Sequence, residues 1–288
     1  MQALEKFKNS LTPSETQILR ECLLEAKQTV PQNSIAWFLG DVNQATGYLD
    51  SQDAKLLQSI SPGWTDCAEG LRWDVVDKTP ESRTMALTSI TEQLRHVGKI
   101  IGWRNEKFSV WTEDSDWLAE TIQPDERGQE AFRMERAAFR FFGVPSHAVH
   151  INGLTPNGDM WCGRRALSKS VDPGMLDNLA AGGLPAGEGL FQCGVREMAE
   201  EAGIPAPLAK TARPYGYVKT YRSVKEGWHH EILWVYNIAL PTEFQPMNQD
   251  GEVDEFVLLK PWQVIQAIQE KAFTVDAACV IAHALMEP

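Results

Sequence analysis

The chain has 288 residues, which is long enough for two domains or for one large, elaborated domain. Hydrophobic residues make up 43% of the chain and ten residues are tryptophan, a composition typical of an ordinary globular protein. The formal net charge of −12 disfavours nonspecific binding to nucleic acid or to an anionic membrane, so we expect neither as a partner.

The first half of the chain predicts a mixture of helices and strands. The segment Thr12-Pro13-Ser14 is a helix start signal. We expect helices at 14–28, 81–99 and 132–142, and strands at 35–39 and 108–111. The acidic, polar stretch 113–129, which contains Pro124 and Gly128, is typical of a connector. These elements predict a smaller α+β amino-terminal domain at 1–125.

From residue 147 the pattern changes to strands. Segments 148–154 and 160–164 are joined by Pro156-Asn157-Gly158-Asp159, which predicts a hairpin-like pairing. Later elements are predicted as a helix at 190–202, strands at 213–224, 231–239 and 252–259, and a helix at 261–270. Mixed strands flanked by helices predict an α/β/α sandwich with a mixed sheet at 126–288, in the α/β class.

One short segment carries the strongest chemical information. Residues 182–204, GGLPAGEGLFQCGVREMAEEAGI, follow the spacing G-x5-E-x7-R-E-h-x-E-E-x-G-h, where h is apolar. Seven specified residues and two apolar ones at fixed offsets are very unlikely to coincide by chance. The segment is identified as a Nudix box, which implies divalent-metal hydrolysis of a diphosphate.

The box is expected to form an amphipathic helix with carboxylates on one face. Its buried stripe is predicted to consist of Phe191, Val195, Met198 and Ala202. Glu197, Glu200 and Glu201 are related by i, i+3 and i+4, so their side chains share one patch of helix surface. Hard oxygen ligands at this density suit Mg²⁺ or Mn²⁺. A solvated acidic face is the plainer interpretation, but it leaves the glycine loop and the fixed intervals unexplained.

Segments outside the box narrow the family further. Residues 102–111, 133–153, 163–188 and 246–256 resemble the Nudix hydrolases related to the domain fused to thiamin pyrophosphokinase in some fungi. The resemblance covers most of the chain, including the region that this family places before its Nudix domain. It implies hydrolysis of a small-molecule substrate, thiamin diphosphate or its oxidised oxo and oxy analogues, to the monophosphate and phosphate.

Two other functions stay open at this point. An enzyme that cleaves nucleoside diphosphate derivatives such as ADP-ribose or NADH would use the same helix. A noncatalytic ligand-binding module on a Nudix fold is an alternative of another class, because fold does not fix function. The complete set of box carboxylates argues against the second alternative.

The resemblance implies roles for the box residues. Glu200 and Glu201 correspond to the principal metal-binding carboxylates, and Glu197 corresponds to a further metal ligand or general base. Arg196 and Glu188 match the pair that orients the catalytic helix and its loop, for which an arginine–carboxylate bridge is the physical reason. A main-chain carbonyl near Ala181 is a further candidate metal ligand.

Residues on both sides of the box complete the candidate site. Glu252 matches the position of an additional catalytic carboxylate, although Glu255 is only three residues away. The candidate substrate-binding residues are Arg164, Arg165, Lys169, Asp177 and Asn178. The three cations could hold terminal phosphate oxygens or could simply form a basic surface loop. The two remaining residues are candidates for orienting the loop or the organic part of the ligand.

The cysteines and the amino terminus bear on the compartment. The five cysteines are scattered and show no paired metal-binding spacing, which favours reduced thiols. The first fifteen residues lack the apolar core of a signal peptide, and no run approaches the length of a membrane span. We therefore predict a cytoplasmic protein, and the sequence leaves open whether it forms a homodimer.

Overall fold

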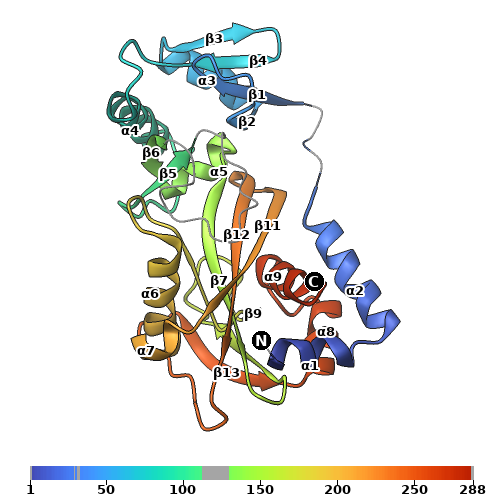
Figure 1. Cartoon of the computed structure of the whole chain (residues 1–288). Helices are drawn as coiled ribbons and strands as arrows, with labels where there is room; N and C mark the ends of the chain where they lie inside the picture. The colour runs from blue at the N-terminus through green and yellow to red at the C-terminus, as the bar shows by residue number, and fades with distance from the viewer. Residues whose placement is uncertain (1, 29, 31–32, 112–129, 287–288) are drawn as a thin grey trace.

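The computed structural model of the chain describes residues 2–28, 30, 33–111 and 130–286. Figure 1 shows a large sheet with helices on its two faces and a smaller sheet beyond one end of it. The predicted connector at 113–129 lies outside the described residues. Within the described part, no helix is both long and apolar enough to cross a membrane.

The amino-terminal helices pack on the same core as the carboxyl-terminal ones. These four helices are α1 (Gln2–Ser10), α2 (Pro13–Glu25), α8 (Pro261–Gln269) and α9 (Val275–Met286). The start signal of α2 is confirmed as a capping box, in which Thr12 and Glu15 exchange hydrogen bonds. Leu4, Phe7 and Leu19 are buried in one cluster with the apolar residues of α9. The first 26 residues therefore stabilise the large sheet.

A second core lies between Trp37 and Val144, and we call it the amino-terminal core. Its elements are β1 (Ser34–Leu39), β2 (Gly47–Asp50), α3 (Ser51–Ile60), β3 (Trp64–Cys67), β4 (Gly70–Trp73) and α4 (Pro80–His96). The strands form a sheet in the order β2-β1-β4-β3, in which β1 and β4 are parallel. Trp37, Trp64 and Phe142 form edge-on and stacked ring contacts in its centre.

The predicted helix at 132–142 is wrong over most of its length. The chain forms β6 (Glu130–Glu135), a 3₁₀ turn (Arg136–Ala138) and the one-turn helix α5 (Phe139–Phe142). β6 pairs antiparallel with β5 (Lys107–Trp111), so Phe132 and Met134 point into the amino-terminal core while Arg133 is exposed. Strand pairing with a distant segment overrides the helical preference of the local sequence.

The large sheet contains seven strands among the described residues. They are β7 (Ser146–Leu154), β8 (Met160–Arg165), β9 (Leu176–Asp177), β10 (Ala180–Gly183), β11 (Arg213–Val224), β12 (Gly227–Ala239) and β13 (Val253–Leu259). The main order is β11-β12-β7-β8-β13, with β10 paired to β7 and β9 paired to β8. Because β7 and β12 run parallel and the other pairs run antiparallel, the sheet is mixed, as predicted.

Alternate residues of β7 and β12 face two different helical layers. Val149 and Trp234 pack with α6 (Leu190–Ala202) and α7 (Ala206–Ala209), whereas Ala148 and Leu233 pack with α9. The α6 layer and the α9 layer lie on opposite sides of the sheet in Figure 1. This arrangement follows from the two-residue period of a strand and confirms the α/β/α sandwich.

Helix α6 has the predicted bounds, but its buried face is rotated from the predicted stripe. Phe191 is 38% exposed, so it was assigned wrongly to the core. The apolar residues that α6 buries are Leu190, Cys193, Gly194, Met198 and Ala202. Glu201 lies on this buried face, which the expectation of an exposed acidic patch did not include. Gly203, in the left-handed conformation with φ 63°, ends the helix.

Candidate functional site

Glu201 is the most deeply buried carboxylate of the box. Its side chain is 8% exposed and accepts a hydrogen bond of 2.8 Å from the main-chain N–H of Ala181 on β10. Burial raises the pKa of Glu201 well above its usual range, and the negative charges of Glu197, Asp177 and Glu252 act in the same direction. A buried acid surrounded by other acids is costly to ionise unless a cation is near it.

Glu197 is seated against a glycine of the box. A Cβ atom at Gly182 would lie 1.9 Å from the Oε1 atom of Glu197, so only glycine lets the carboxylate approach the main chain of β10. Burial raises the pKa of Glu197, Arg196 opposes this effect, and Glu200 and Glu252 add to it. The motif therefore requires a glycine at position 182 for a steric reason, because any larger residue would collide with the carboxylate of Glu197.

Arg196 links the helix to the loop that precedes it. Its Nε and Nη2 atoms donate to the two carboxylate oxygens of Glu188 at 3.0 and 2.8 Å, which is a bidentate bridge. Its Nη1 atom also donates to Glu197 at 2.8 Å and to Glu200 at 3.0 Å. The structure thus brings Arg196 and Glu188 together and makes Arg196 a cation shared by three carboxylates.

Of the two late carboxylates, Glu252 lies nearer the box. Its charge raises the pKa values of Glu197 and Glu201, and its carboxylate pairs with Lys169. Glu255 instead pairs with Arg164 at 2.6 Å, on the outer edge of the sheet between β8 and β13. We use the name box cluster for Glu188, Glu197, Glu200, Glu201 and Glu252 together with Arg196 and Lys169.

The predicted substrate cations are all engaged with carboxylates. Arg164 pairs with Glu255, Lys169 pairs with Glu252, and Arg165 donates to Asp177 at 2.7 Å. The side chain of Arg165 also donates to the main-chain oxygen of Val171. These pairs shape the loop between β8 and β9, so a phosphate group would have to share or displace a carboxylate partner.

Asn178 holds together the strands beside the box. It is 2% exposed, its Nδ2 atom donates to Asn152 at 2.8 Å, and its Oδ1 atom lies 2.8 Å from Nδ1 of His150. Asn152 donates in turn to Asn237 on β12. This chain of amides pairs buried polar groups inside the sandwich, although Nδ2 of Asn237 has no hydrogen-bond partner among the described residues, so the contacts present are structural ones.

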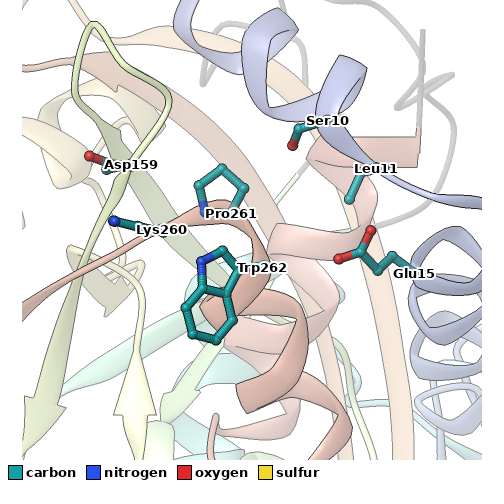
Figure 2. Close-up of a pocket in the computed structure, with 7 residues that line it drawn as sticks. All are labelled: Ser10, Leu11, Glu15, Asp159, Lys260, Pro261 and Trp262. Atoms are coloured by element: carbon teal, nitrogen blue, oxygen red, sulfur yellow. The ribbon is translucent and has the colours of Figure 1, made fainter.

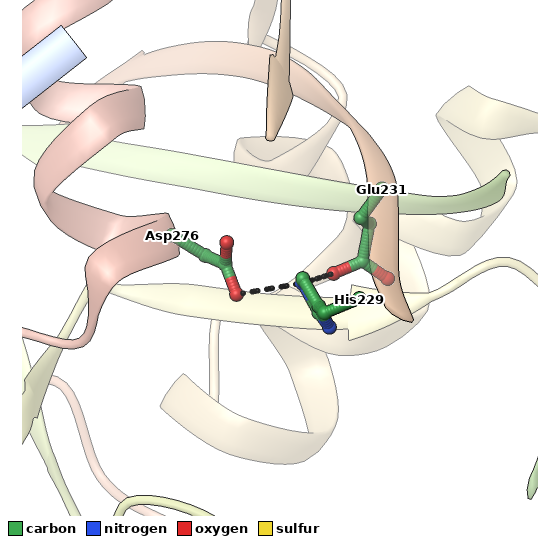
Figure 3. Close-up of side chains that lie close together, drawn as sticks. All are labelled: His229, Glu231 and Asp276. Carbon is green, nitrogen blue, oxygen red and sulfur yellow. Dashed lines mark ion pairs between the residues drawn. The ribbon is translucent and has the colours of Figure 1, made fainter. Parts of the chain in front are cut away.

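A second charged cluster lies on the α9 side of the sheet. Nε2 of His229 is 3.2 Å from Glu231 and 3.3 Å from Asp276, without hydrogen-bond geometry to either (Figure 3). Arg222 holds both oxygens of Asp276 at 2.7 and 2.8 Å. We call these four residues the α9 cluster.

The α9 cluster balances its own charge. Burial alone would lower the pKa of His229, but Asp276 and Glu231 outweigh it and raise the pKa to about 9. At neutral pH two carboxylates therefore face two cations, His229 and Arg222. Three residues of this cluster have ligand atoms within 4.8 Å of one another, yet a metal ion would have to displace a proton and compete with a bidentate guanidinium. The contacts describe a buried ion-pair network that joins α9 to β12.

A pocket of about 320 Å³ lies away from both clusters. It is lined by Ser10, Leu11, Glu15, Asp159, Lys260, Pro261 and Trp262. Figure 2 shows these side chains on α1, α2, the β7–β8 turn and the start of α8, on the side of the sheet away from α6. None of the box residues lines this pocket, so its shape does not define the candidate site.

The amino-terminal core brings residues to the box that the local sequence does not indicate. The main-chain oxygen of Lys107 on β5 accepts a hydrogen bond of 2.8 Å from the N–H of Ala186 in the box loop. Phe108 packs over Gly183, and Arg136 lies over the ring of Phe108. These contacts join segments far apart in the chain. The predicted helix at 132–142 gave no reason to place Arg136 near the box, because that placement depends on the strand β6 and the turn that follows it.

The chain is similar in sequence to proteins described as Nudix hydrolases. The family model described as "NUDIX domain" matches residues 146–283. Nudix hydrolase 24, chloroplastic, from Arabidopsis thaliana is 32% identical over 85% of this chain and 67% of its own length. Nudix hydrolase 20, chloroplastic, from the same plant is 34% identical over 80% of this chain and 62% of its own length. The crystal structure of DR0079 from Deinococcus radiodurans covers 61% of this chain and 97% of its own at 18% identity, with a TM-score of 0.45.

Proposed function

Since the chain belongs to the Nudix hydrolase family, whose members act on phosphorus anhydrides, we propose that it is a metal-dependent hydrolase of a small-molecule diphosphate. The observation that carries the proposal is the charge imbalance of the box cluster. Five carboxylates face only two cations there, and the most buried carboxylate, Glu201, makes no ion pair with either of them.

The residues present fit a divalent ion. Glu197, Glu200 and Glu201 offer carboxylate oxygens, and the main chain at Ala181 and the side chain of Glu252 offer further oxygen donors, the set that Mg²⁺ and Mn²⁺ prefer. When bound, such an ion supplies neutralisation of phosphate charge and a lower pKa for the attacking water. Its charge would also offset the burial and the mutual repulsion that together raise the pKa values of Glu197 and Glu201.

The protein groups then have separate tasks. Gly182 lets Glu197 lie against β10, and Ala181 holds Glu201 through its N–H, so both carboxylates keep fixed positions. Arg196 and Glu188 hold the helix and its loop in register. A carboxylate in this cluster accepts the proton of the attacking water, and we assign that task to Glu197 or Glu252.

We propose thiamin diphosphate, or its oxidised oxo and oxy analogues, as the substrate and the monophosphate and phosphate as products. The support is the resemblance of four segments, 102–111, 133–153, 163–188 and 246–256. These segments meet around the box. Segment 102–111 contacts the box loop, and the main-chain N–H groups of Met247 and Gln249 donate to Ala202 and Glu200. The residues that carry the resemblance are therefore those that surround the proposed site.

The cytoplasm stays our proposed compartment, and a homodimer stays the alternative to a monomer. All five cysteines are free in the structure, which agrees with a reducing compartment. The two plant relatives carry the word chloroplastic in their own names. Cell fractionation and sedimentation in solution test these two proposals.

The decisive experiment is a substrate panel with product identification. The purified chain is incubated with Mg²⁺ or Mn²⁺ and with thiamin diphosphate, its oxo and oxy analogues, ADP-ribose or NADH. We expect metal-dependent release of phosphate from the thiamin compounds, with the oxidised forms preferred. A kcat/KM for either nucleotide far above all three thiamin compounds would reassign the substrate. Failure to cleave any of them with either metal would favour the noncatalytic module.

A further inference from the structure

The box loop is held from two sides. The N–H of Leu184 donates to His147 on β7 at 2.8 Å, within the Nudix sheet. The N–H of Ala186 donates to Lys107 on β5 at 2.8 Å, and β5 belongs to the amino-terminal core. Gly187, in the left-handed conformation with φ 87°, follows directly. One support of the catalytic loop thus comes from outside the matched Nudix segment 146–283.

Phe108 closes the contact between β5 and this loop. A Cβ atom at Gly183 would lie 2.5 Å from Cζ and 2.9 Å from Cε2 of Phe108, so the ring lies directly on the main chain of the loop. The ring cannot move aside easily, because it is buried, packs edge-on against Phe139 at 5.7 Å and is covered by Arg136 at 5.0 Å.

Arg136 is itself fixed by the turn before β5. Its Nη1 atom donates to Glu106 at 2.6 Å, and its main-chain N–H donates to the oxygen of the same residue at 2.9 Å. The carboxylate of Glu135, only 4% exposed, accepts from the N–H groups of Arg104 and Glu106 and so sets this turn. The side chain of Arg136 is 42% exposed, and its Nη2 atom would lie 3.7 Å from a Cβ at Gly183.

We propose that the amino-terminal core is part of the catalytic apparatus, with Phe108 and Arg136 as positioning residues that set the box loop and, through it, Glu197. The link is short, since Phe108 packs on Gly183 and Glu197 packs on Gly182, the next residue. The proposal rests on the hydrolase function proposed above. It gives the amino-terminal core a task, because without β5 the loop would lose the hydrogen bond from Ala186 and would keep its supports on β7 and on Arg196.

A double-mutant test follows from the geometry. Gly183→Ala adds the Cβ that collides with Cζ and Cε2 of Phe108, and Phe108→Leu removes those two atoms while keeping an apolar side chain. Since a misplacement of about 1 Å can cost up to about 10²-fold in rate, we expect Gly183→Ala to lower kcat at least about tenfold with a smaller change in KM. Phe108→Leu alone should cost about threefold or less, and the double variant should recover most of the loss.

A second pair of variants tests Arg136 without touching the core. Arg136→Ala should lower kcat several-fold, whereas Arg133→Ala, which removes an exposed cation from the same hairpin, should leave kcat unchanged. Arg133 pairs locally with Glu130 and is the matched control. Equal kcat values for the two arginine variants, or a double variant no better than Gly183→Ala, would overturn the proposal.

Hydrogen exchange tests the same contact without relying on activity. In Arg136→Ala, the peptide that spans 183–189 should exchange faster than in the wild type and in Arg133→Ala, while peptides of β11 and β12 should not change. If the wild type cleaves no diphosphate but this difference is seen, the proposed function fails and the positioning contact stands. If the wild type is active and the exchange does not differ, only the positioning proposal fails.

Discussion

The two charged clusters of this protein lie on opposite faces of one sheet and solve the same electrostatic problem differently. In the α9 cluster, His229 and Arg222 match Glu231 and Asp276 one for one. In the box cluster, carboxylates outnumber cations, and Glu201 is buried with a single main-chain donor as its hydrogen-bond partner among the described residues. A balanced cluster needs no bound ion to offset its charge, whereas an unbalanced one favours a bound cation and therefore indicates function.

The comparison also separates two signals that are often treated as one. Three ligand-type residues lie within 4.8 Å of one another in the α9 cluster, and pKa values are strongly shifted in both clusters. Neither the closeness of ligand-type residues nor a shifted pKa distinguishes the box cluster, which is the candidate site, from the α9 cluster, which is an ion-pair network. Net charge distinguishes the two clusters. Carboxylates that are paired with cations do not need a bound metal ion, whereas an excess of buried carboxylates does.

The largest effect is expected from Glu201→Gln. The substitution keeps the size of the side chain and the acceptor for Ala181, but it removes a charge that we assign to metal binding. Turnover with Mg²⁺ should fall by roughly 10²-fold or more, as for other key electrostatic contacts. The melting temperature without metal should not fall, because an unfavourable buried charge is lost. Near-wild-type turnover in steady-state assays would remove Glu201 from the site.

The opposite result is expected from Asp276→Asn. This change leaves Glu231 as the one carboxylate of the α9 cluster that faces Arg222 and His229, and removing one partner of a buried pair costs about 3 to 5 kcal/mol. Urea unfolding should show that loss of stability. The kcat of the folded fraction should stay close to that of the wild type, because the α9 cluster lies on the other face of the sheet. A selective loss of kcat without a loss of stability would make the α9 cluster a functional site.

The α9 cluster should also make the stability fall at alkaline pH. The pKa of His229 is raised to about 9 in the folded chain, so its contribution is fully present below the unfolded value near 6.5. The contribution falls as the pH rises from about 6.5 to about 9, because in that range the folded state still holds a proton that the unfolded state has lost, and it is gone once the pH has passed about 9.

At about 1.4 kcal/mol per pKa unit, the alkaline loss for the wild type is about 2 kcal/mol between pH 7 and 9.5. Urea unfolding at a series of pH values measures it. The matched control is His229→Gln, which is less stable at neutral pH but should lose much less between the same two values. A wild type and a variant with parallel pH profiles would mean that His229 is not a charged partner of Asp276 and Glu231.

The sequence predicts those features of the site that neighbouring residues determine. It does not predict those that depend on contacts between segments far apart in the chain. The predicted bounds of helix α6 agree with the observed ones, because the signals that start and end the helix lie next to it in the chain. Gly189 directly precedes the helix and Gly203 directly follows it. The burial of Glu201 is not predicted, because it depends on the packing of α6 against β10. Ala181 on β10, whose N–H donates to Glu201, lies twenty residues earlier in the chain. Phe191 was placed in the core because its spacing is helical, whereas the contact with β7 selects the neighbouring face.

The region before the Nudix segment was harder to predict for the same reason. Residues 132–142 contain phenylalanines at spacings that suit a helix as well as a strand, and pairing with β5 decides between them. The roles of Phe108 and Arg136 depend on that pairing and on the approach of Gly183. Gly183, the last residue of β10, is visible in the sequence, but the ring of Phe108 that requires a glycine there is not.

The smallest effects on stability are expected from Arg196→Ala and Glu200→Gln, two changes in the ion pairs of Arg196. Arg196→Ala removes the bidentate bridge to Glu188, so both kcat and stability should fall, the stability by about 1 kcal/mol because the pair is partly exposed. Glu200→Gln loses only a half-exposed contact of 3.0 Å and relieves repulsion within the box cluster. Its melting temperature should stay within about one degree of the wild type, while its kcat falls because a metal-binding charge is gone. Calorimetry and steady-state kinetics on both variants decide the matter, and equal melting temperatures for Arg196→Ala and wild type would show that the bridge does not brace the loop.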